Sequence, residues 1–281
     1  MDFKRKVVAL EGRLRRCRNV VTIGVRPNFC DYGPEERKMI RTAETVYYPT
    51  VFYADLFNAA GKNTFPSYHT YKCVQDKIKQ TALFELLGIP HPRTRVFYGN
   101  RQKAKIGDFF QFPFIAKIPR GSAQGKGVYL IQDGGDLDAY CGRTAVAYIQ
   151  EYLPHERDLR VILVNYEPIL SYWRQRDPSN FRANLHQGGF PQFLEIPDEA
   201  LSLARDTALR CRFNDVGLDL IPCRGKWYII EANMEYGREG LRMKGMDLKR
   251  ILRDKLLSGE LTPAQSGSNN GAASGRPAWV A

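Results

Sequence analysis

Residues 217–233 read GLDLIPCRGKWYIIEAN in the one-letter code. Apolar, aromatic and β-branched residues fill both halves of this stretch, and the dipeptide Arg224-Gly225 stands between them. The pattern predicts two strands, Gly217–Pro222 and Lys226–Ala232, joined as a hairpin. Neighbouring side chains on a strand point to opposite faces, and this alternation places the polar residues of the hairpin.

Three residues of this hairpin carry side-chain oxygens and are candidate metal ligands. Glu231 and Asn233 lie two residues apart, hence on one face, and Asp219 lies on the partner strand. Oxygen ligands of this kind suit a magnesium ion held together with a nucleotide. A two-residue turn would set Asp219 opposite Ile230 and turn Glu231 away, so we expect a connection of odd length. The alternative is that these are solvated acids on the polar face of a strand.

A glycine-rich loop lies earlier in the chain. Strands are predicted at Phe112–Ile118 and Val128–Ile131, and the loop GSAQGKG occupies residues 121–127 between them. Its three glycines would let the backbone approach a bound group, and Lys117 and Lys126 could neutralise phosphate oxygens. The loop matches neither GxxxxGK[ST] nor GxGxxG. An ordinary hairpin with a glycine turn is the alternative.

Two further polar segments suit a nucleotide. The sequence QEYL at 150–153 ends a predicted strand, Val146–Tyr152, and its exposed backbone could read an adenine edge, while Asp158 could hold ribose hydroxyls. The stretch WRQRDPSNFRANLHQGG at 173–189 supplies arginines, whose planar guanidinium groups fit phosphate. The alternatives are an ordinary strand end with a charged loop and a basic surface loop.

The remaining pattern predicts alternating helices and strands with a loose tail from Ser258 onward. A helix over Val74–Leu87 is expected to bury Ile78, Ala82, Leu83, Leu86 and Leu87 and to end at a left-handed Gly88. The other expected elements are a short basic helix at 3–18, a first buried strand at Asn19–Val25, a helix from Pro34 to about Thr45, strands at Leu159–Val164 and Ile169–Trp173, and helices at Asp198–Arg212 and Asp247–Leu257.

Composition excludes several classes of protein. The chain has 281 residues, of which 43% are hydrophobic, so most of it can form a packed core. No apolar run is long enough to span a membrane, and we expect a cytoplasmic protein. The six cysteines show no CxxC pair and are expected to be reduced thiols. The net charge of +12 suits a polyanion such as ATP; a nucleic-acid role for the basic N-terminal arm is a weaker alternative to a solvated helix.

In this order the segments resemble the ATP-grasp superfamily, in its RimK branch of glutamate ligases. The resemblance covers about residues 66–257. It rests on the following stretches: QDK at 75–77 opening a helix that ends LGIPHP, FPFIAK at 112–117, QEYL with DLR at 158–160, FRANLHQGG at 181–189, GLDLI at 217–221 and IEAN at 230–233.

The resemblance implies an α/β fold in which two lobes with antiparallel sheets clamp ATP. A short N-terminal α/β unit (1–70) would precede the ATP-grasp domain (71–257), whose lobes are about 71–147 and 148–257, and a disordered tail (258–281) would follow. The implied catalytic residues are Arg160, Arg174 and Arg182; the nucleotide-binding residues are Lys77, Lys117, Gly121, Ser122, Gly125, Lys126, Gly127, Glu151, Tyr152, Leu153, Asp158, Arg182 and Asn184; and the ligands of Mg²⁺ or Mn²⁺ are Asp219, Glu231 and Asn233.

The family's reaction is the ATP-dependent ligation of a carboxylate to an amine through an acyl phosphate. The implied partners are a small or peptide carboxylate acceptor and an amino-acid amine donor, with glutamate as the family default and neither nucleic acid nor membrane. After Asn233 the chain reads MEYGREG, where the family commonly has Ser-Pro-Gly, so the amine is left open. The short front unit and this departure motivate an alternative, an ATP-binding regulatory or scaffold protein without turnover. The oligomeric state is open, a homo-oligomer included.

Overall fold

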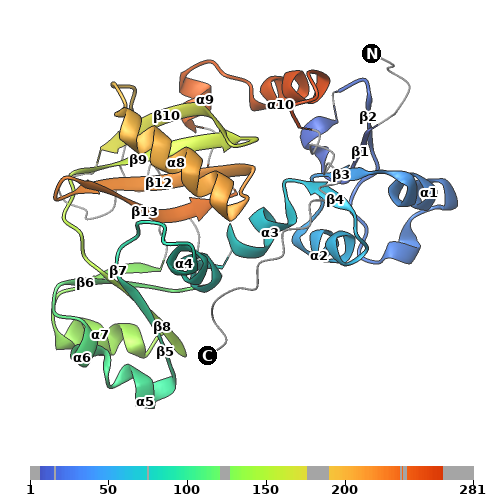
Figure 1. Ribbon diagram of the computed structural model, residues 1–281. Helices are drawn as coiled ribbons and strands as arrows, with labels where there is room; N and C mark the ends of the chain where they lie inside the picture. Colours follow the sequence, from blue (N-terminus) through green and yellow to red (C-terminus); the bar gives the residue numbers. More distant parts are fainter. Residues whose placement is uncertain are drawn as a thin grey trace, which may run out of the picture.

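The computed structural model describes residues 7–261 apart from 16, 75, 121–126, 176–189, 235, 237 and 238. Within these residues the chain forms three sheets that follow one another along the sequence (Figure 1). A parallel sheet comes first, a small antiparallel sheet second and a larger antiparallel sheet third. The α/β unit and the two antiparallel sheets agree with the predicted architecture.

The N-terminal unit is a parallel sheet with helices. Its strands have the order β2-β1-β3-β4, and residues Val8, Ile40, Val46 and Tyr53 form part of its buried core. The elements are β1 (Val7–Ala9), the 3-10 turn η1 (Gly12–Leu14), β2 (Val20–Thr22), the 3-10 turn η2 (Phe29–Asp31), α1 (Pro34–Thr42), β3 (Thr45–Tyr47), α2 (Val51–Ala59) and β4 (Asn63–Phe65).

The basic helix expected at residues 3–18 is wrong for the part that the structure describes. The chain there forms β1 and η1, and β1 lies between β2 and β3 in the sheet. The strand expected at Asn19–Val25 exists as β2, but it is a half-buried edge strand rather than the first buried one. Val7 and Val8 are β-branched, and pairing on both sides favours a strand there despite the basic neighbours.

The second sheet is antiparallel, with the order β5-β8-β6-β7. Helices α5, α6 and α7 pack on one face of it over a core that includes Phe97, Phe114 and Ile149 (Figure 1). β8 pairs with β5 and β6 along its whole length, so this sheet reaches Glu151. The elements of this region are α3 (Tyr68–Val74), α4 (Lys77–Leu86), β5 (Thr94–Tyr98), α5 (Gly99–Lys103), α6 (Ile106–Phe109), β6 (Phe114–Lys117), β7 (Val128–Ile131), α7 (Gly134–Cys141) and β8 (Val146–Glu151).

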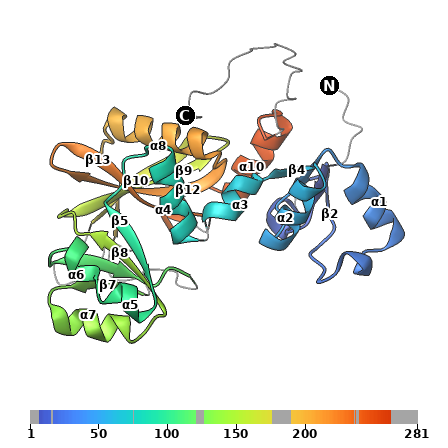
Figure 2. The same cartoon turned by 60° about the horizontal axis from the view of Figure 1, so that its bottom comes forward.

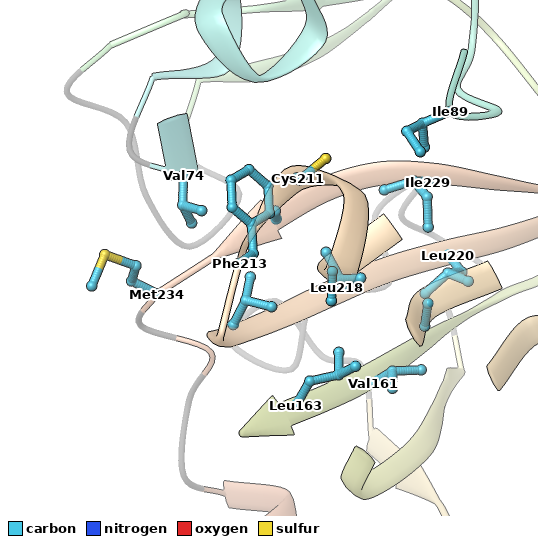
Figure 3. Packing of buried hydrophobic residues seen from close by; sticks show 14 of the residues in the cluster. Val74, Ile89, Val161, Leu163, Cys211, Phe213, Leu218, Leu220, Ile229 and Met234 are labelled. Carbon is cyan, nitrogen blue, oxygen red and sulfur yellow. The ribbon is translucent and has the colours of Figure 1, made fainter. Parts of the chain in front are cut away.

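The third sheet is antiparallel with the order β11-β10-β9-β12-β13, and α8 lies across one of its faces (Figures 1 and 2). Figure 3 shows the core beneath that helix, where Val161, Leu218 and Phe213 pack together. The elements are β9 (Arg157–Val164), β10 (Glu167–Gln175), β11 (Phe190–Gln192), α8 (Asp198–Cys211), β12 (Asp215–Cys223), β13 (Lys226–Asn233), α9 (Glu239–Met243) and α10 (Leu248–Leu257).

The two faces of this sheet differ in chemistry. On β9, Leu159, Val161 and Leu163 pack in the core under α8. Because side chains alternate along a strand, Asp158 and Arg160 point to the opposite face. Both are nonetheless buried, at 4% and 7% exposure. The face away from α8 therefore carries buried charges at this end of β9, and the candidate site lies there.

The helix expected at Val74–Leu87 is present mainly as α4, and its predicted buried face is right only in part: Leu83 and Leu87 pack against the core, but Ala82 and Leu86 are exposed. Asp76 caps its N-terminus by accepting hydrogen bonds from the next turn, and Gly88 has a positive φ of 62°, as predicted. However, Leu86 is 81% exposed, and the residues turned inward are Gln80, Thr81 and Phe84. Tertiary neighbours, rather than apolar periodicity, set this face.

Helix α10 joins the N-terminal unit to the large sheet (Figure 2). Leu252 and Leu256 share a buried cluster with Tyr47 of the N-terminal unit and Ile162 of β9. The hydroxyl of Tyr47 also donates to the carbonyl of Leu261, at 3.2 Å. The C-terminal helix therefore holds two sheets together.

All six cysteines are free thiols, as predicted. In the part of the chain that the structure describes, no helix has the length and apolar character needed to cross a membrane.

Candidate active site

A β-bulge brings two candidate metal ligands to one face of the hairpin. The turn has two residues, both with positive φ, at 50° and 72°. Leu220 pairs with Ile229, but the next pair is Asp219 with Glu231, so Ile230 is the extra residue of the bulge. The expected connection of odd length is therefore wrong. The additional residue lies inside β13, and it sets the two carboxylates opposite each other.

A buried row of alternating charges crosses the sheet beside this pair. We call it the arginine–aspartate row: Asp158 and Arg160 on β9, Arg174 on β10 and Asp219 on β12. Arg174 donates to both oxygens of Asp158, at 2.6 and 2.8 Å, and its Nη2 lies 3.0 Å from Asp219. Arg160 donates to both oxygens of Asp219. All four side chains are nearly buried, so each charge depends on its neighbours.

The charges of the row act on each other's protonation. Burial raises the pKa of Asp158, and Arg174 offsets this only in part. Burial also acts to raise the pKa of Asp219, but Arg160 and Arg174 together hold that pKa below its ordinary value. For Arg174, burial is outweighed by the two aspartates, and the pKa of the guanidinium is raised. Asp219 and Arg174 are therefore charged at neutral pH.

Two lysines face the carboxylates from outside the large sheet. Lys77 begins α4, and its Nζ lies 3.2 Å from Oε1 of Glu231. Lys117 ends β6 and is 7% exposed, with its Nζ 5.9 Å from the centroid of the Tyr148 ring. Burial lowers the pKa of Lys117 to about 8, although Glu231 and Asp219 oppose that change. Cations held in so little water suit an anionic ligand such as a phosphate chain.

Gln80 of α4 fixes the strand that carries the candidate ligands. Its amide donates to the carbonyl of Ala232 at 3.0 Å and accepts from the Ala232 N–H at 2.8 Å. Ala232 stands between Glu231 and Asn233, so both side chains are set by this contact. Sequence reasoning missed Gln80. Nothing in the sequence marked it, because periodicity treats a glutamine among the polar residues of this helix as exposed.

The hinge between the antiparallel sheets is the predicted adenine-binding segment, Glu151, Tyr152 and Leu153. The side chain of Glu151 accepts from the backbone N–H of Arg93 at 2.7 Å, on the face of β8 that carries Ala147 and Ile149. Its carboxylate therefore points away from Lys117, and the backbone of this segment is what can meet a base. Leu153 is 7% exposed and belongs to an apolar cluster with Ile221, against which Ile230 packs. That cluster forms an apolar surface beside the hinge.

Asp158 is buried inside the row rather than open to a ribose. We expected it to hold ribose hydroxyls, but both its oxygens accept from Arg174, and the side chain is 4% exposed. In this structure Asp158 instead fixes the position of Arg174.

Several predicted nucleotide-binding residues cannot be placed. Gly127 is described: its φ is 78°, and its carbonyl accepts from the Ile118 N–H at 2.7 Å, which closes the base of the glycine loop. The following predicted residues lie outside the described part of the chain: Gly121, Ser122, Gly125, Lys126, Arg182 and Asn184.

The donor atoms fit a magnesium ion that is shared with a nucleotide. Among the described residues, no group of three or more His, Cys, Asp or Glu is placed to hold a metal by itself. Asp219 and Glu231 oppose each other, and Asn233 continues the same face of β13. Two carboxylates and an amide suit Mg²⁺, which keeps few protein ligands and takes others from substrate phosphates. The chemistry of this set therefore fits the implied metal.

The fold is that of the ATP-grasp class. A RimK domain ATP-grasp protein from Sphaerobacter thermophilus superposes with a TM-score of 0.63 at 16% identity, covering 89% of this chain and 98% of that one. The D-alanine–D-alanine ligase of Bacillus anthracis gives 0.64 at 12% identity, over 92% and 97% of the two chains. The predicted fold class is thus confirmed.

Residues 74–256 match the family model described as the RimK-like ATP-grasp domain, and the chain belongs to that family. A relative from Enterobacter sp. (strain 638), called a probable alpha-L-glutamate ligase, is 27% identical over 182 residues. One with the same description from Alkalilimnicola ehrlichii is 30% identical, and a ribosomal protein bS6–L-glutamate ligase from Escherichia fergusonii is 26% identical. Each match covers 62% of this chain and 60% of the relative, so the chain spans about three fifths of their length.

Proposed function

We propose that this protein is an ATP-dependent ligase that joins a carboxylate to an amine. The observation that carries the proposal is the meeting of Lys77 and Lys117 with Asp219 and Glu231, beside the arginine–aspartate row. The names of the relatives favour glutamate as the amine donor and a peptide or a small acid as the acceptor. We also propose that the protein acts in the cytoplasm, in line with its family, whose named relatives include a ligase for a ribosomal protein.

The chemistry proceeds in two transfers. The carboxylate oxygen of the acceptor attacks the γ-phosphorus of ATP, the bond to the β,γ-bridging oxygen breaks, and ADP leaves. The amine then attacks the acyl carbon, phosphate leaves with the C–O electron pair, and the amine loses a proton. Neither step requires a covalent bond to the protein, so the residues act by alignment and by charge.

The protein's cations are held in place before the reaction. Asp158 fixes Arg174, Asp219 fixes Arg160, and Glu231 lies against Lys77. Charges that are already oriented stabilise a phosphoryl transition state without reorganisation at the moment of reaction. Lys117 sits at the end of β6, beside the glycine loop, and would contact the phosphate chain from the small sheet.

Asp219, Glu231 and Asn233 would hold Mg²⁺ or Mn²⁺. When bound, the ion supplies positive charge between the phosphates and lowers the cost of moving negative charge toward ADP. Asp219 already accepts from Arg160 and lies against Arg174, so an ion at this carboxylate would be held beside the two guanidinium groups that the site keeps in place.

The test is the release of ADP from ATP with magnesium, measured with glutamate and a panel of small acids and peptides. Acceptor-dependent release should fall at least a hundredfold in Glu231→Ala, because that carboxylate is both a metal ligand and the partner of Lys77. Glu167→Ala is the matched control, since Glu167 is exposed and forms a surface ion pair with Arg205. Undiminished turnover in Glu231→Ala would contradict the assignment.

A second outcome distinguishes the alternative function. If ATP raises the melting temperature but no acid and amine together release ADP, the protein is an ATP-binding regulatory protein. A ligand that binds only the folded state stabilises it by about 2.7 kcal/mol at a hundred times its Kd. Nucleotide binding is therefore measurable independently of turnover.

A further inference from the structure

Tyr236 lies directly on the strand that carries a candidate metal ligand. Asp215, Gly217 and Asp219 share one face of β12, because they are two residues apart. A Cβ atom added at Gly217 would stand 2.3 Å from the Cβ of Tyr236, which no real pair of carbons tolerates. Tyr236 therefore packs directly against the backbone of Gly217, between Asp215 and Asp219.

Both ends of Tyr236 make hydrogen bonds along this face. Its carbonyl accepts from Nη1 of Arg160 at 2.6 Å, while the same arginine donates to Asp219. Its hydroxyl donates to Oδ1 of Asp215 at 2.8 Å. The residue is 3% exposed, so little solvent competes for these contacts. Tyr236 therefore connects the arginine of the site to the start of β12.

Asp215 is also the point where the N-terminal unit contacts this sheet. The hydroxyl of Tyr48, which follows β3, donates to Oδ2 of Asp215 at 3.1 Å. Nη1 of Arg13 lies 3.9 Å from the same oxygen, and its guanidinium lies 5.1 Å from the Tyr48 ring centroid. Asp215 is 1% exposed, so a shift of the N-terminal unit must move its hydrogen bonds.

We propose that Tyr236 is a positioning residue that couples the docking of the N-terminal unit to the orientation of Arg160. The proposal rests on the proposed ligase function. The guanidinium of Arg160 donates to Asp219 on one side and to the Tyr236 carbonyl on the other, and these contacts fix the orientation of its plane. A displacement of about 1 Å at such a group costs up to about a hundredfold in rate. Ligation would then be fast only with the N-terminal unit docked.

The kinetic test compares Tyr236→Phe, Tyr48→Phe and the double variant. Each removes a hydroxyl that donates to Asp215 and leaves the Tyr236 carbonyl in place. We expect kcat for acceptor-dependent ADP release to fall about tenfold to a hundredfold in each. The KM for ATP should stay within about threefold. The double variant should be no slower than the slower single variant, because both substitutions interrupt the same chain of contacts. Tyr53→Phe is the control: the hydroxyl of Tyr53 donates to the backbone carbonyl of Arg26 within the N-terminal unit, at 2.8 Å.

A second readout does not depend on turnover. In ¹⁵N NMR the Nε–H signal of Arg160 is identified as the one that Arg160→Lys loses. It should move in Tyr236→Phe and Tyr48→Phe, although Tyr48 belongs to another sheet, and stay in Tyr53→Phe. If the wild type has no acceptor-dependent turnover but the signal moves, the ligase function fails and the coupling stands. A signal that does not respond to Tyr48→Phe, or multiplicative kcat losses in the double variant, overturns the coupling.

Discussion

Lys117 is a buried cation, and its pKa predicts how stability depends on pH. Burial lowers that pKa from 10.5 to about 8, so between these values the unfolded chain binds the proton and the folded chain releases it. The free energy of unfolding should therefore rise as the pH increases from about 8 to 10.5. Below pH 8 the folded protein carries the full cost of the buried charge, about 3 kcal/mol.

Lys117→Met tests this reasoning by removing the charge while keeping the length of the side chain. The variant should be more stable than the wild type at pH 7 without nucleotide, and the difference should shrink toward pH 10. Urea unfolding at both pH values measures it, and the ATP-induced rise in melting temperature should be lost. A difference in stability that does not change with pH would show that Lys117 has an ordinary pKa.

Gly217 gives a second prediction at the residue scale. Because a Cβ there would stand 2.3 Å from that of Tyr236, Gly217→Ala must push the tyrosine off the strand. Overpacking of this kind costs about 1–3 kcal/mol, measured as a lower urea midpoint. In Gly134→Ala, where nothing lies within 4 Å of the new methyl group, the midpoint should stay the same or rise. Equal effects in the two variants would contradict the packing described for Tyr236.

At the scale of the elements, α4 shows that contacts with a neighbouring strand decide which face of a helix is buried. Gln80 supplies a donor and an acceptor to Ala232 of β13, and both backbone groups are buried beside it. In Gln80→Leu they lose their partners, which costs about 1–3 kcal/mol for each group left unsatisfied. On the same helix Leu86 is 81% exposed, so Leu86→Gln should change the free energy of unfolding by less than about 0.5 kcal/mol. Apolar periodicity alone predicts that Leu86→Gln destabilises the protein more than Gln80→Leu does. Denaturant unfolding of the two variants distinguishes these expectations.

The elements also show how far sequence reasoning reaches. The 217–233 hairpin, α8 and α10 could be predicted because each has a clear hydrophobic periodicity or a clear turn sequence of its own. The inner face of α4 could not, because it depends on a backbone amide more than a hundred residues away in the chain. The bulge at Ile230 could not be predicted either, because one extra residue does not change the pattern of a run of apolar residues. Asp219 and Glu231 could be named as ligand types, and Arg160 and Arg174 followed from the resemblance, but the ion pairs that these arginines form with Asp219 could not be predicted.

At the scale of the whole molecule, the proposed nucleotide site and the docking of the N-terminal unit depend on different contacts. The phosphate-binding residues of the proposed site lie between the two antiparallel sheets, as the ion pair of Lys77 with Glu231 indicates. The N-terminal unit reaches that site through Asp215 and through the cluster around α10. Binding of ATP and docking of the N-terminal unit should therefore be separable by mutation.

Substitution of Leu252 in α10 should separate ATP binding from the docking of the N-terminal unit. It is fully buried between Tyr47 and Ile162, whereas Leu257 on the same helix is 44% exposed. Leu252→Ala should cost about 2–5 kcal/mol of local packing, and Leu257→Ala should cost far less. If α10 is what holds the N-terminal unit, Leu252→Ala will make the segment between that unit and α4 sensitive to protease. The variant will still gain melting temperature from magnesium and ATP, because the substitution leaves the residues of the proposed nucleotide site in place, but it will lose acceptor-dependent ADP release. Loss of the nucleotide response together with turnover would instead mean that the three sheets unfold as one unit.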